Sequence, residues 1–251
     1  IFFGNMLYLE ILIIAFLIFF QSIFGIGLLL IGTPTFLLIG YSFLDVLSIL
    51  LPISITISSI QFFLSNVKNK KFIYNFNFFC LPILIISLYF IINNIDRVNL
   101  ELFISIVIIF FSILGLNKKK FKYLKNITVT KQKIFLSLLG FIHGLSNLGG
   151  ALLTILSSAI NDGNKNKTRH CIAYGYLIMG IIQILAIYFF SEIRIKIVNL
   201  LYIGLVFLIY FPTQKIFNNL NEERFLKFLN IFALFYGVII LINNIKNLKN
   251  E

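Results

Sequence analysis

Long apolar runs separated by short polar stretches recur along the whole chain. Runs such as IISLYFII (85–92) and ISIVIIFFSIL (104–114) are continuous, whereas the strands of a transmembrane β-barrel alternate apolar and polar residues, so a barrel is excluded. An apolar run of about 17 residues or more can cross a bilayer as a helix. The pattern therefore predicts an all-α, polytopic membrane protein with about eight transmembrane segments, at 7–40, 43–66, 72–92, 99–117, 133–160, 170–190, 195–211 and 225–245.

Two of these segments are too long for one straight crossing, and both contain glycine. At about 1.5 Å per residue, the segment 7–40 would extend about 51 Å, against a hydrocarbon core of about 30 Å. It contains FGIGLLLIGTP (24–34), and the segment 133–160 contains GLSNLGG (144–150). Both segments are therefore predicted to be broken helices, with new helices starting near Leu28 and Ala151.

The two interruptions occupy the same place in two halves of the chain. An offset of 122 residues aligns Gly27 with Gly149, and NIDRVNLELF (94–103) resembles NEERFLKFLN (221–230). Each half thus opens with a glycine-broken helix and continues with plain helices. We predict an internal duplication, with a first transmembrane repeat at 1–117, a basic linker at 118–132 and a second repeat at 133–251. A chance alignment of glycine-rich apolar sequence is the alternative.

The charged residues indicate which side of the membrane the loops face. Hydrophobic residues make up 59% of the chain and charged residues 12%, and the mean hydropathy is +0.99. A net charge of +12 would suit a nucleic-acid partner, but the Lys and Arg lie in short loops, where they mark the cytoplasmic face. We therefore expect no nucleic acid. The linker KKKFKYLKNITVTK is placed in the cytoplasm, and the protein in the lipid of the inner (plasma) membrane as a multi-pass protein.

The sequence leaves the number of crossings open. If each broken segment crosses once, the chain crosses eight times, both termini are cytoplasmic and the repeats are parallel. If each crosses twice, there are ten crossings, the termini face outward and the repeats are inverted. The Lys and Arg are about twofold more frequent on one side in the first case, and the bias is larger in the second. Either way the linker is cytoplasmic. The first apolar stretch has no basic region before it and no cleavage site after it, so it is expected to be a retained helix.

Polar groups gather at the two breaks. A broken helix leaves backbone N–H and C=O groups unpaired at membrane depth, which is tolerated only inside protein or beside a cavity. The helix that restarts after each break points its N-terminus, a favourable place for an anion, at the break. We therefore predict a site for a small anion, formed by Gln21, Gly25, Gly27 and Thr33 in the first half and by His143, Ser146, Asn147, Gly149 and Gly150 in the second. Close helix packing through small residues is the alternative.

Ionisable groups are sparse in the predicted spans. His143, at the place that corresponds to Gln21, is either a neutral bridge between helices or a donor or proton carrier for the substrate. Arg169 and His170 follow the polar loop NDGNKNKT and are expected to attract anions toward one mouth, or else to mark topology. The only two cysteines predict neither a disulfide framework nor a metal site.

Common catalytic and nucleotide-binding motifs are absent from the sequence. GLSNLGG departs from GxSxG because Leu148 takes the place of the final glycine, and HExxH, CxxC and GxxxxGK[ST] do not occur. We therefore expect no enzyme, no cofactor and no ATP-driven pump, but a secondary transporter. A channel or carrier for a cation or neutral solute and an intramembrane accessory protein are the alternatives. A homo-oligomer is left open.

The sequence resembles the TauE/SafE membrane family over about residues 7–245. The resemblance rests on FQSIFGIGLLLIGTPTFLLIG (20–40), on GFIHGLSNLGGALL (140–153) and on KNKTRHCIAYGYL (165–177) with its basic loop. It implies the export of a small anion such as sulfite or an organosulfonate, coupled to an ion or driven by the membrane potential, without ATP. Asn147 stands where the family often has glycine, and Leu28 where it often has a small residue, so the backbone approach to a ligand is expected to differ.

Overall fold

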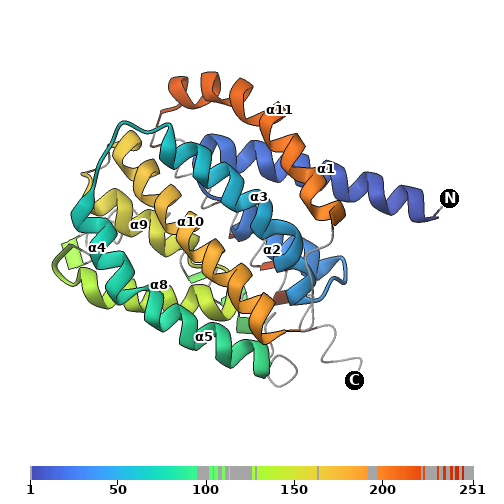
Figure 1. The fold of residues 1–251 in the computed structure, drawn as a ribbon, viewed down its shortest axis with the longest axis horizontal. Coiled ribbons are helices and arrows are strands. Elements are labelled where there is room, and N and C mark those ends of the chain that lie inside the picture. The colour runs from blue at the N-terminus through green and yellow to red at the C-terminus, as the bar shows by residue number, and fades with distance from the viewer. Residues whose placement is uncertain are drawn as a thin grey trace.

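The computed structural model describes residues 2–94, 126–127, 129–162, 164–191 and 197–221, with stretches of one or two residues between 102 and 113 and between 223 and 245. Regular structure within these residues is entirely helical, which confirms the predicted all-α fold. The helices of Figure 1 are α1 (Phe2–Phe24), α2 (Leu28–Leu38), α3 (Phe43–Phe63), α4 (Lys70–Phe79), α5 (Leu81–Asn93), α8 (Gln132–Ser146), α9 (Gly150–Ile160), α10 (Lys165–Phe190) and α11 (Ile197–Asn219). The predicted segments 99–117 and 225–245, the similar stretches 94–103 and 221–230, and most of the linker lie largely outside the described residues.

Several of these helices have the length and composition of membrane spans. Within the described residues, four helical stretches are long and apolar enough to cross a bilayer. They are Phe43–Phe63, Lys70–Asn93 (α4 and α5 together), Lys165–Phe190 and Asn199–Asn219, and shorter apolar helices cover Tyr8–Phe24 and Leu28–Leu38. The protein is therefore a polytopic helical membrane protein.

The first broken segment is a helical hairpin. Gly25 (φ 75°) and Gly27 (φ 122°) follow α1 with a left-handed backbone that other residues rarely adopt, which ends the helix and turns the chain. Beyond α2, the hydroxyl of Tyr41 donates to Glu10 near the start of α1, at 2.9 Å. The short helix α2 therefore runs back antiparallel to α1.

The second broken segment is a hairpin as well. Asn147 ends α8 with a left-handed φ of 62°, a conformation that asparagine tolerates better than most residues. Both arms of this hairpin have their outer ends beside the start of α4. Asn75 donates to Gln132 at the start of α8, and Asn69 donates to Asn161 at the end of α9, each at 3.4 Å. The helix α9 therefore returns to the end of the bundle from which α8 came.

The antiparallel helices α3 and α10 form the centre of the bundle (Figure 1). The rings of Phe62 and His170 stack with centroids 4.8 Å apart, while farther along the pair Gly180 lies so close to Ile55 that an added Cβ would be 2.7 Å from its Cγ1. Gly144 brings α8 similarly close to α5. Small residues at such contacts allow helix backbones to approach each other.

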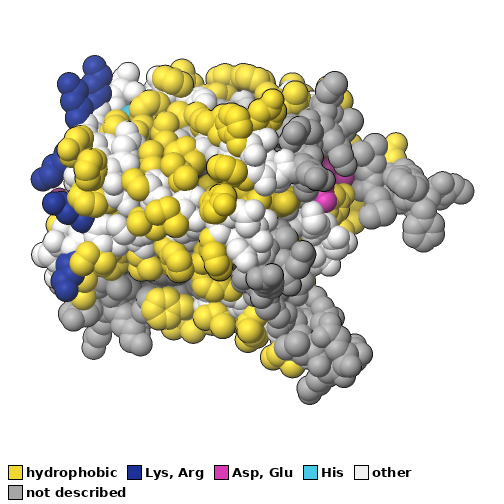
Figure 2. Space-filling view, turned by 60° about the horizontal axis from the view of Figure 1, so that its bottom comes forward, with side chains coloured by type: hydrophobic (Ala, Val, Ile, Leu, Met, Phe, Trp, Pro, Cys, Tyr) yellow, Lys and Arg dark blue, Asp and Glu magenta, His cyan; other side chains and the backbone are white. Residues whose placement is uncertain are grey.

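The two ends of the bundle differ in charge. The helices α4, α8 and α10 begin at one end, which carries Lys70, Lys133 and Lys165 and is called the basic end below; Figure 2 shows the Lys and Arg side chains gathered there. At the opposite end Glu10 accepts from Tyr41, and burial together with this hydrogen bond raises the pKa of Tyr41 to about 12. The first hairpin enters the bundle from the opposite end, and the second enters from the basic end.

The positions of both predicted breaks are confirmed, and the half-helices restart at Leu28 and Gly150. The helices α2 and α9 have 11 residues each, and α9 starts 122 residues after α2. The central helix α10 likewise starts 122 residues after α3. This spacing agrees with the predicted duplication, although the repeat boundaries at 117 and 133 remain predictions.

Several element boundaries differ from those expected, and α11 ends at Asn219 rather than at 211. The helix α10 begins at Lys165 rather than at 170, because the side chain of Asn164 caps it by accepting from the Lys167 N–H at 3.0 Å. The segment 72–92 is divided into α4 and α5 at Cys80, with a proline in the first turn of α5. Because α10 begins at Lys165, part of the polar loop 161–168 lies inside this helix.

Candidate functional site

At the first break, two glutamine side chains connect the end of α1 to α3. Gln21 is fully buried, and its Nε2 donates to the hydroxyls of Ser54 at 3.2 Å and Ser58 at 3.3 Å. Gln61 of α3 donates from Nε2 to the backbone carbonyls of Gln21 at 3.1 Å and Ser22 at 3.3 Å. These amides hold the last turn of α1 in place where the helix stops.

Arg169 of α10 reaches the same turn of α1. Its Nη2 donates to the carbonyl of Ser22 at 3.3 Å, to the hydroxyl of Tyr210 at 3.0 Å and to Oε1 of Gln214 at 2.8 Å. Its guanidinium carbon lies 4.1 Å from the centroid of the Phe217 ring. Because a guanidinium is planar, the ring and the three acceptors together fix its orientation.

A polar pocket of about 340 Å³ lies beside this arginine at the basic end. The loop 64–67 between α3 and α4 forms part of its wall, together with Gln61, Arg169, His170, Tyr210 and Gln214. No carboxylate side chain lines the pocket among the described residues. A Cβ added at Gly25 would lie 3.5 Å from Cγ of Arg169, so the first break adjoins the residues of this pocket.

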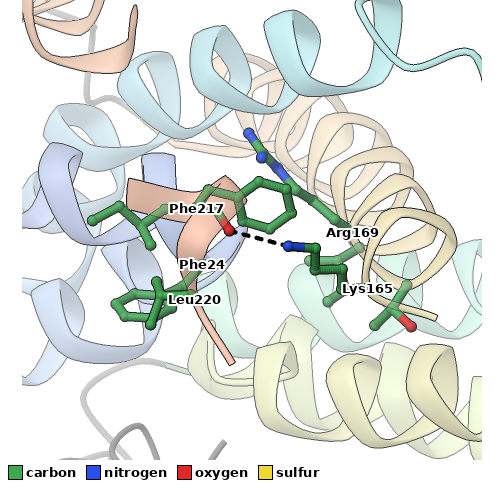
Figure 3. A pocket seen from close by; sticks show the side chains of 8 residues that line it. Phe24, Lys165, Arg169, Phe217 and Leu220 are labelled. Carbon is green, nitrogen blue, oxygen red and sulfur yellow. Dashed lines mark hydrogen bonds between the residues drawn. The ribbon is translucent and has the colours of Figure 1, made fainter. Parts of the chain in front are cut away.

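A smaller, mainly apolar pocket of about 40 Å³ lies where α1, α10 and α11 meet (Figure 3). In this view Lys165 points at the backbone of Phe217, to whose carbonyl it donates at 3.3 Å, and Phe24 and Leu220 close the apolar side. The lining is mainly apolar, and the residues of this pocket fasten α11 to α10.

At the second break, a chain of buried side chains connects the two halves of the protein. Asn147 donates from Nδ2 to the hydroxyl of Thr33 on α2 at 3.0 Å, and Gln183 of α10 donates to Oδ1 of Asn147 at 3.2 Å. His143 accepts at Nδ1 from the Gly149 N–H at 3.2 Å, and its Nε2 lies 3.3 Å from Oε1 of Gln183. The ring is therefore neutral with its proton on Nε2, as in the predicted bridge between helices.

The two breaks are built by corresponding residues. Gln61 lies 122 residues before Gln183, the same offset that separates Gln21 from His143. In the first half Gln61 contacts Gln21, and in the second half Gln183 contacts His143. An amide on the central helix thus supports the end of the broken helix in both halves.

The structure brings the predicted site residues together in two groups rather than one. Thr33, His143 and Asn147 meet at the second break, through Gln183. Gln21 and Gly25 lie at the first break, where Arg169 joins them. His170 lines the polar pocket, and Arg169 reaches from the pocket to the break itself.

Four other predicted residues make local contacts. The hydroxyl of Ser146 donates to the carbonyl of Ile142 in its own helix, at 2.7 Å. An added Cβ at any of the three glycines would collide with a neighbouring side chain: Gly27 with Phe20, Gly149 with His143 and Gly150 with Tyr176. Close packing, the alternative weighed for these glycines, describes their surroundings.

Sequence reasoning missed Gln61, Gln183, Tyr210 and Gln214. The two amides on α3 and α10 could have been found, because they are polar residues in apolar sequence at the offset of 122. Tyr210 and Gln214 could not, because tyrosine and glutamine near the end of an apolar helix are unremarkable in composition. Only the packing of α11 beside Arg169 brings them to the pocket.

The donor set does not suit a metal ion. No group of three His, Cys, Asp or Glu side chains able to hold one occurs in the part of the chain that the structure describes. Both cysteines are buried and free. What the pocket offers instead is a guanidinium with amide, hydroxyl and imidazole groups around it.

Comparison with known proteins connects this arrangement to one family. No curated protein and no solved structure was found to match the chain. The family model described as "Sulfite exporter TauE/SafE" matches residues 10–240, nearly the full length, and so confirms the resemblance seen in the glycine motifs. The chain therefore belongs to the sulfite exporter TauE/SafE family, a family of membrane transporters of the sulfite and organosulfonate type.

Proposed function

We propose that this protein is a secondary transporter that exports a small anion, sulfite or an organosulfonate, from the cytoplasm across the plasma membrane. Its membership of the TauE/SafE family supports the type of substrate. Transport involves no chemical conversion of the anion. The breaks and the polar pocket then serve to bind the substrate and to change its access from one side to the other.

The proposed direction rests on charge and on the position of the pocket. Lys and Arg gather at the basic end (Figure 2), and basic residues mark the cytoplasmic face of membrane proteins. The polar pocket lies at this end, beside the loop 64–67 and Asn166. An anion from the cytoplasm would enter there.

The single observation that carries the mechanism is the opposite condition of the two breaks. The first break, near the basic end, adjoins a polar pocket, while the second is closed by hydrogen bonds among Thr33, Asn147, Gln183 and His143. The hairpin that contains the second break enters the bundle from the basic end, whereas the first hairpin enters from the opposite end. Inverted halves that exchange conformations around a shared site are the usual basis of alternating access. In the second state the first break would close and the second would open toward the opposite end.

The membrane potential suffices to drive this export. An inside-negative potential favours the outward movement of an anion by about 2.3 kcal/mol per charge per 100 mV. A uniporter, which carries the anion without a coupled ion, would therefore export it. Coupling to a second ion would add to this driving force without changing the binding site.

The test is an efflux measurement in proteoliposomes loaded with radiolabelled sulfite, with liposomes lacking the protein as the control. A potassium diffusion potential, negative inside, should accelerate protein-dependent efflux, and ATP should leave it unchanged. Reversing the potential should slow the efflux. Absence of protein-dependent sulfite and sulfonate efflux at either potential, or efflux of potassium in its place, would contradict the proposed function.

A further inference from the structure

We infer that the polar pocket at the first break is an oxyanion-binding site centred on Arg169, and that Gln61 in it accepts a hydrogen bond from the bound anion. This inference rests on the proposed function and adds the binding residues and a preference among substrates. It also assigns unequal roles to the two breaks. The anion would bind at the first, while the second closes the path.

The charge of Arg169 is not matched by protein groups. The side chain is half-buried, and no ion pair to it occurs among the described residues. All three of its hydrogen bonds come from Nη2, which leaves Nε and Nη1 without a partner in the described part of the chain. The Nε–H and Nη1–H groups therefore remain available to donate to the oxygens of a sulfonate or sulfite.

Further donors surround the arginine. His170 is only 4% exposed and lines the pocket, yet neither ring nitrogen has a hydrogen-bond partner. The hydroxyl of Ser22, in the turn that Arg169 contacts, is buried and equally unpaired. The hydroxyl of Tyr210 accepts from Arg169, so its own proton is available to another acceptor. Buried polar groups are almost always paired, and an oxyanion supplies the acceptors that these groups lack.

Two unmatched groups at this break, Oε1 of Gln21 and Oε1 of Gln61, are acceptors rather than donors, and of these two residues Gln61 lines the pocket. The Nε2 of Gln61 faces two backbone carbonyls, which fixes the orientation of the amide and leaves Oε1 buried and unpaired. This oxygen lies 3.7 Å from the position of an added Cβ on Gly25, close to the arginine. It would repel a bare oxyanion but would accept a hydrogen bond from one that carries a proton or a hydroxyl. The site should therefore prefer an oxyanion with a donor, such as hydrogen sulfite or a hydroxyalkanesulfonate.

Among the described residues, the second break has no equivalent set of unpaired groups around a cation. Its amide, hydroxyl and imidazole groups are paired with each other, and Leu47 occupies the position 122 residues before Arg169, so no second arginine accompanies the duplication. A single anion site would therefore serve both states.

Isothermal titration calorimetry of the detergent-solubilised protein at constant ionic strength would test the arginine. Ethanesulfonate is the probe, and choline is the cation control. We expect Arg169→Gln to raise the Kd at least tenfold. Lys167→Gln, which removes the same charge from an exposed position on the same turn of α10, should change it less than twofold. If Arg169→Gln fails to fold, Tyr210→Phe removes only a hydroxyl and should still weaken binding at least threefold.

Several outcomes would overturn the inference. One is an unchanged Kd for ethanesulfonate in folded Arg169→Gln or in Tyr210→Phe. Another is binding of short-chain phosphatidylglycerol without binding of sulfonates, because this result would indicate a site for a lipid headgroup. A measurement of sulfonate efflux distinguishes failure of this inference from failure of the proposed function. Wild-type efflux that Arg169→Gln leaves intact contradicts the inference alone, whereas no efflux from wild-type protein contradicts the function.

The preference for a donor has its own test. Wild-type protein should bind isethionate, which carries a hydroxyl, at least threefold more tightly than ethanesulfonate. Gln61→Leu should bring the ratio of the two Kd values to about one. Equal affinities in the wild-type protein, or a difference that persists in Gln61→Leu, would show that Gln61 does not select the substrate.

Discussion

The two breaks use the same backbone device with different side chains. At corresponding positions Gly25 has a φ of 75° and Asn147 a φ of 62°, so the chain leaves each helix through the same left-handed turn. Glycine at this place leaves room beside Arg169, and asparagine fills the place with an amide that bonds Thr33 and Gln183. The same turn thus adjoins a pocket where its residue is glycine, and it is closed by hydrogen bonds where its residue is asparagine.

The breaks also differ in how well their polar groups are matched. At the first, Ser22 Oγ, Gln21 Oε1 and Gln61 Oε1 are buried without partners. At the second, the groups of the four-residue network are paired, and the Tyr176 hydroxyl beside Gly150 is the nearby group without a partner among the described residues. Unpaired buried groups are costly unless a ligand or water meets them. The first break is therefore suited to binding, and the second to holding the bundle together.

The largest effect is expected from removing the glycine backbone of the first break. Gly27→Ala puts a Cβ on a residue with a φ of 122° and against the ring of Phe20. We expect a loss of about 2–5 kcal/mol in the free energy of unfolding, from left-handed strain plus overpacking, and loss of transport. The chain has no Trp, and both of its cysteines are buried, so a fluorogenic thiol dye can report thermal unfolding.

Gly40→Ala is the matched control for this variant. Gly40 has a φ of 99°, but nothing lies within 4 Å of an added Cβ. It should lose only the strain, about 1–2 kcal/mol. Equal unfolding temperatures for the two variants would mean that the contact with Phe20 does not contribute.

The second-largest effect is expected from removing the side chain that closes the second break. Asn147→Gly keeps the left-handed turn but leaves the Thr33 hydroxyl and the Gln183 amide without their partner. We expect the free energy of unfolding to fall by about 1–3 kcal/mol. Asn147→Leu, which adds left-handed strain, should unfold at a still lower temperature. If Asn147→Gly unfolds at the same temperature as the wild-type protein, the network does not stabilise this conformation.

The corresponding glutamines offer a direct comparison between the halves. Gln183→Leu leaves Nε2 of His143 and Oδ1 of Asn147 without a partner in a closed interior, whereas Gln61→Leu leaves the Ser22 carbonyl its bonds to Arg169 and Gln214. We expect Gln183→Leu to be the more destabilising by about 1 kcal/mol. The same dye measurement compares them, and the reverse order would contradict the view that the second break is the closed one.

The smallest effect is expected when the first break receives the residue of the second. In Gly25→Asn the left-handed φ remains acceptable, and the added Cβ would meet Cγ of Arg169 at an ordinary 3.5 Å. The change in unfolding free energy should stay within about 1 kcal/mol. Gly25→Val, with a β-branched side chain at the same φ, should be clearly less stable. If Gly25→Asn and Gly25→Val unfold at the same temperature, the left-handed φ does not restrict which residues this position tolerates.

The sequence allowed a good prediction of where the broken helices are. Hydropathy and glycine content are local properties, and both hairpin turns occur at the glycine-containing stretches. The same reasoning singled out Thr33, His143 and Asn147, because a polar residue in apolar sequence needs a partner. It could not show that Thr33 is that partner for Asn147. The two residues are 114 positions apart and meet only because the second hairpin turns against α2.

The sequence also left open whether each broken segment crosses the membrane once or returns. The structure has a returning helix in both cases, since Tyr41 lies beside Glu10 and Asn161 lies beside Asn69. The direction of a half-helix after a glycine depends on the φ values of the turn and on what it packs against. Neither is contained in hydropathy.

The sequence by itself determined the helical membrane architecture, the two breaks, the offset of 122 residues between them and the family. These follow from the order of apolar, small and charged residues along the chain. Only the tertiary structure decided which break is open, because that depends on side chains from distant helices. Arg169 is separated from Ser22 by 147 positions, and it reaches the first break because α10 packs antiparallel to α3. A charge next to a polar loop in the sequence thereby lines the polar pocket beside the first break.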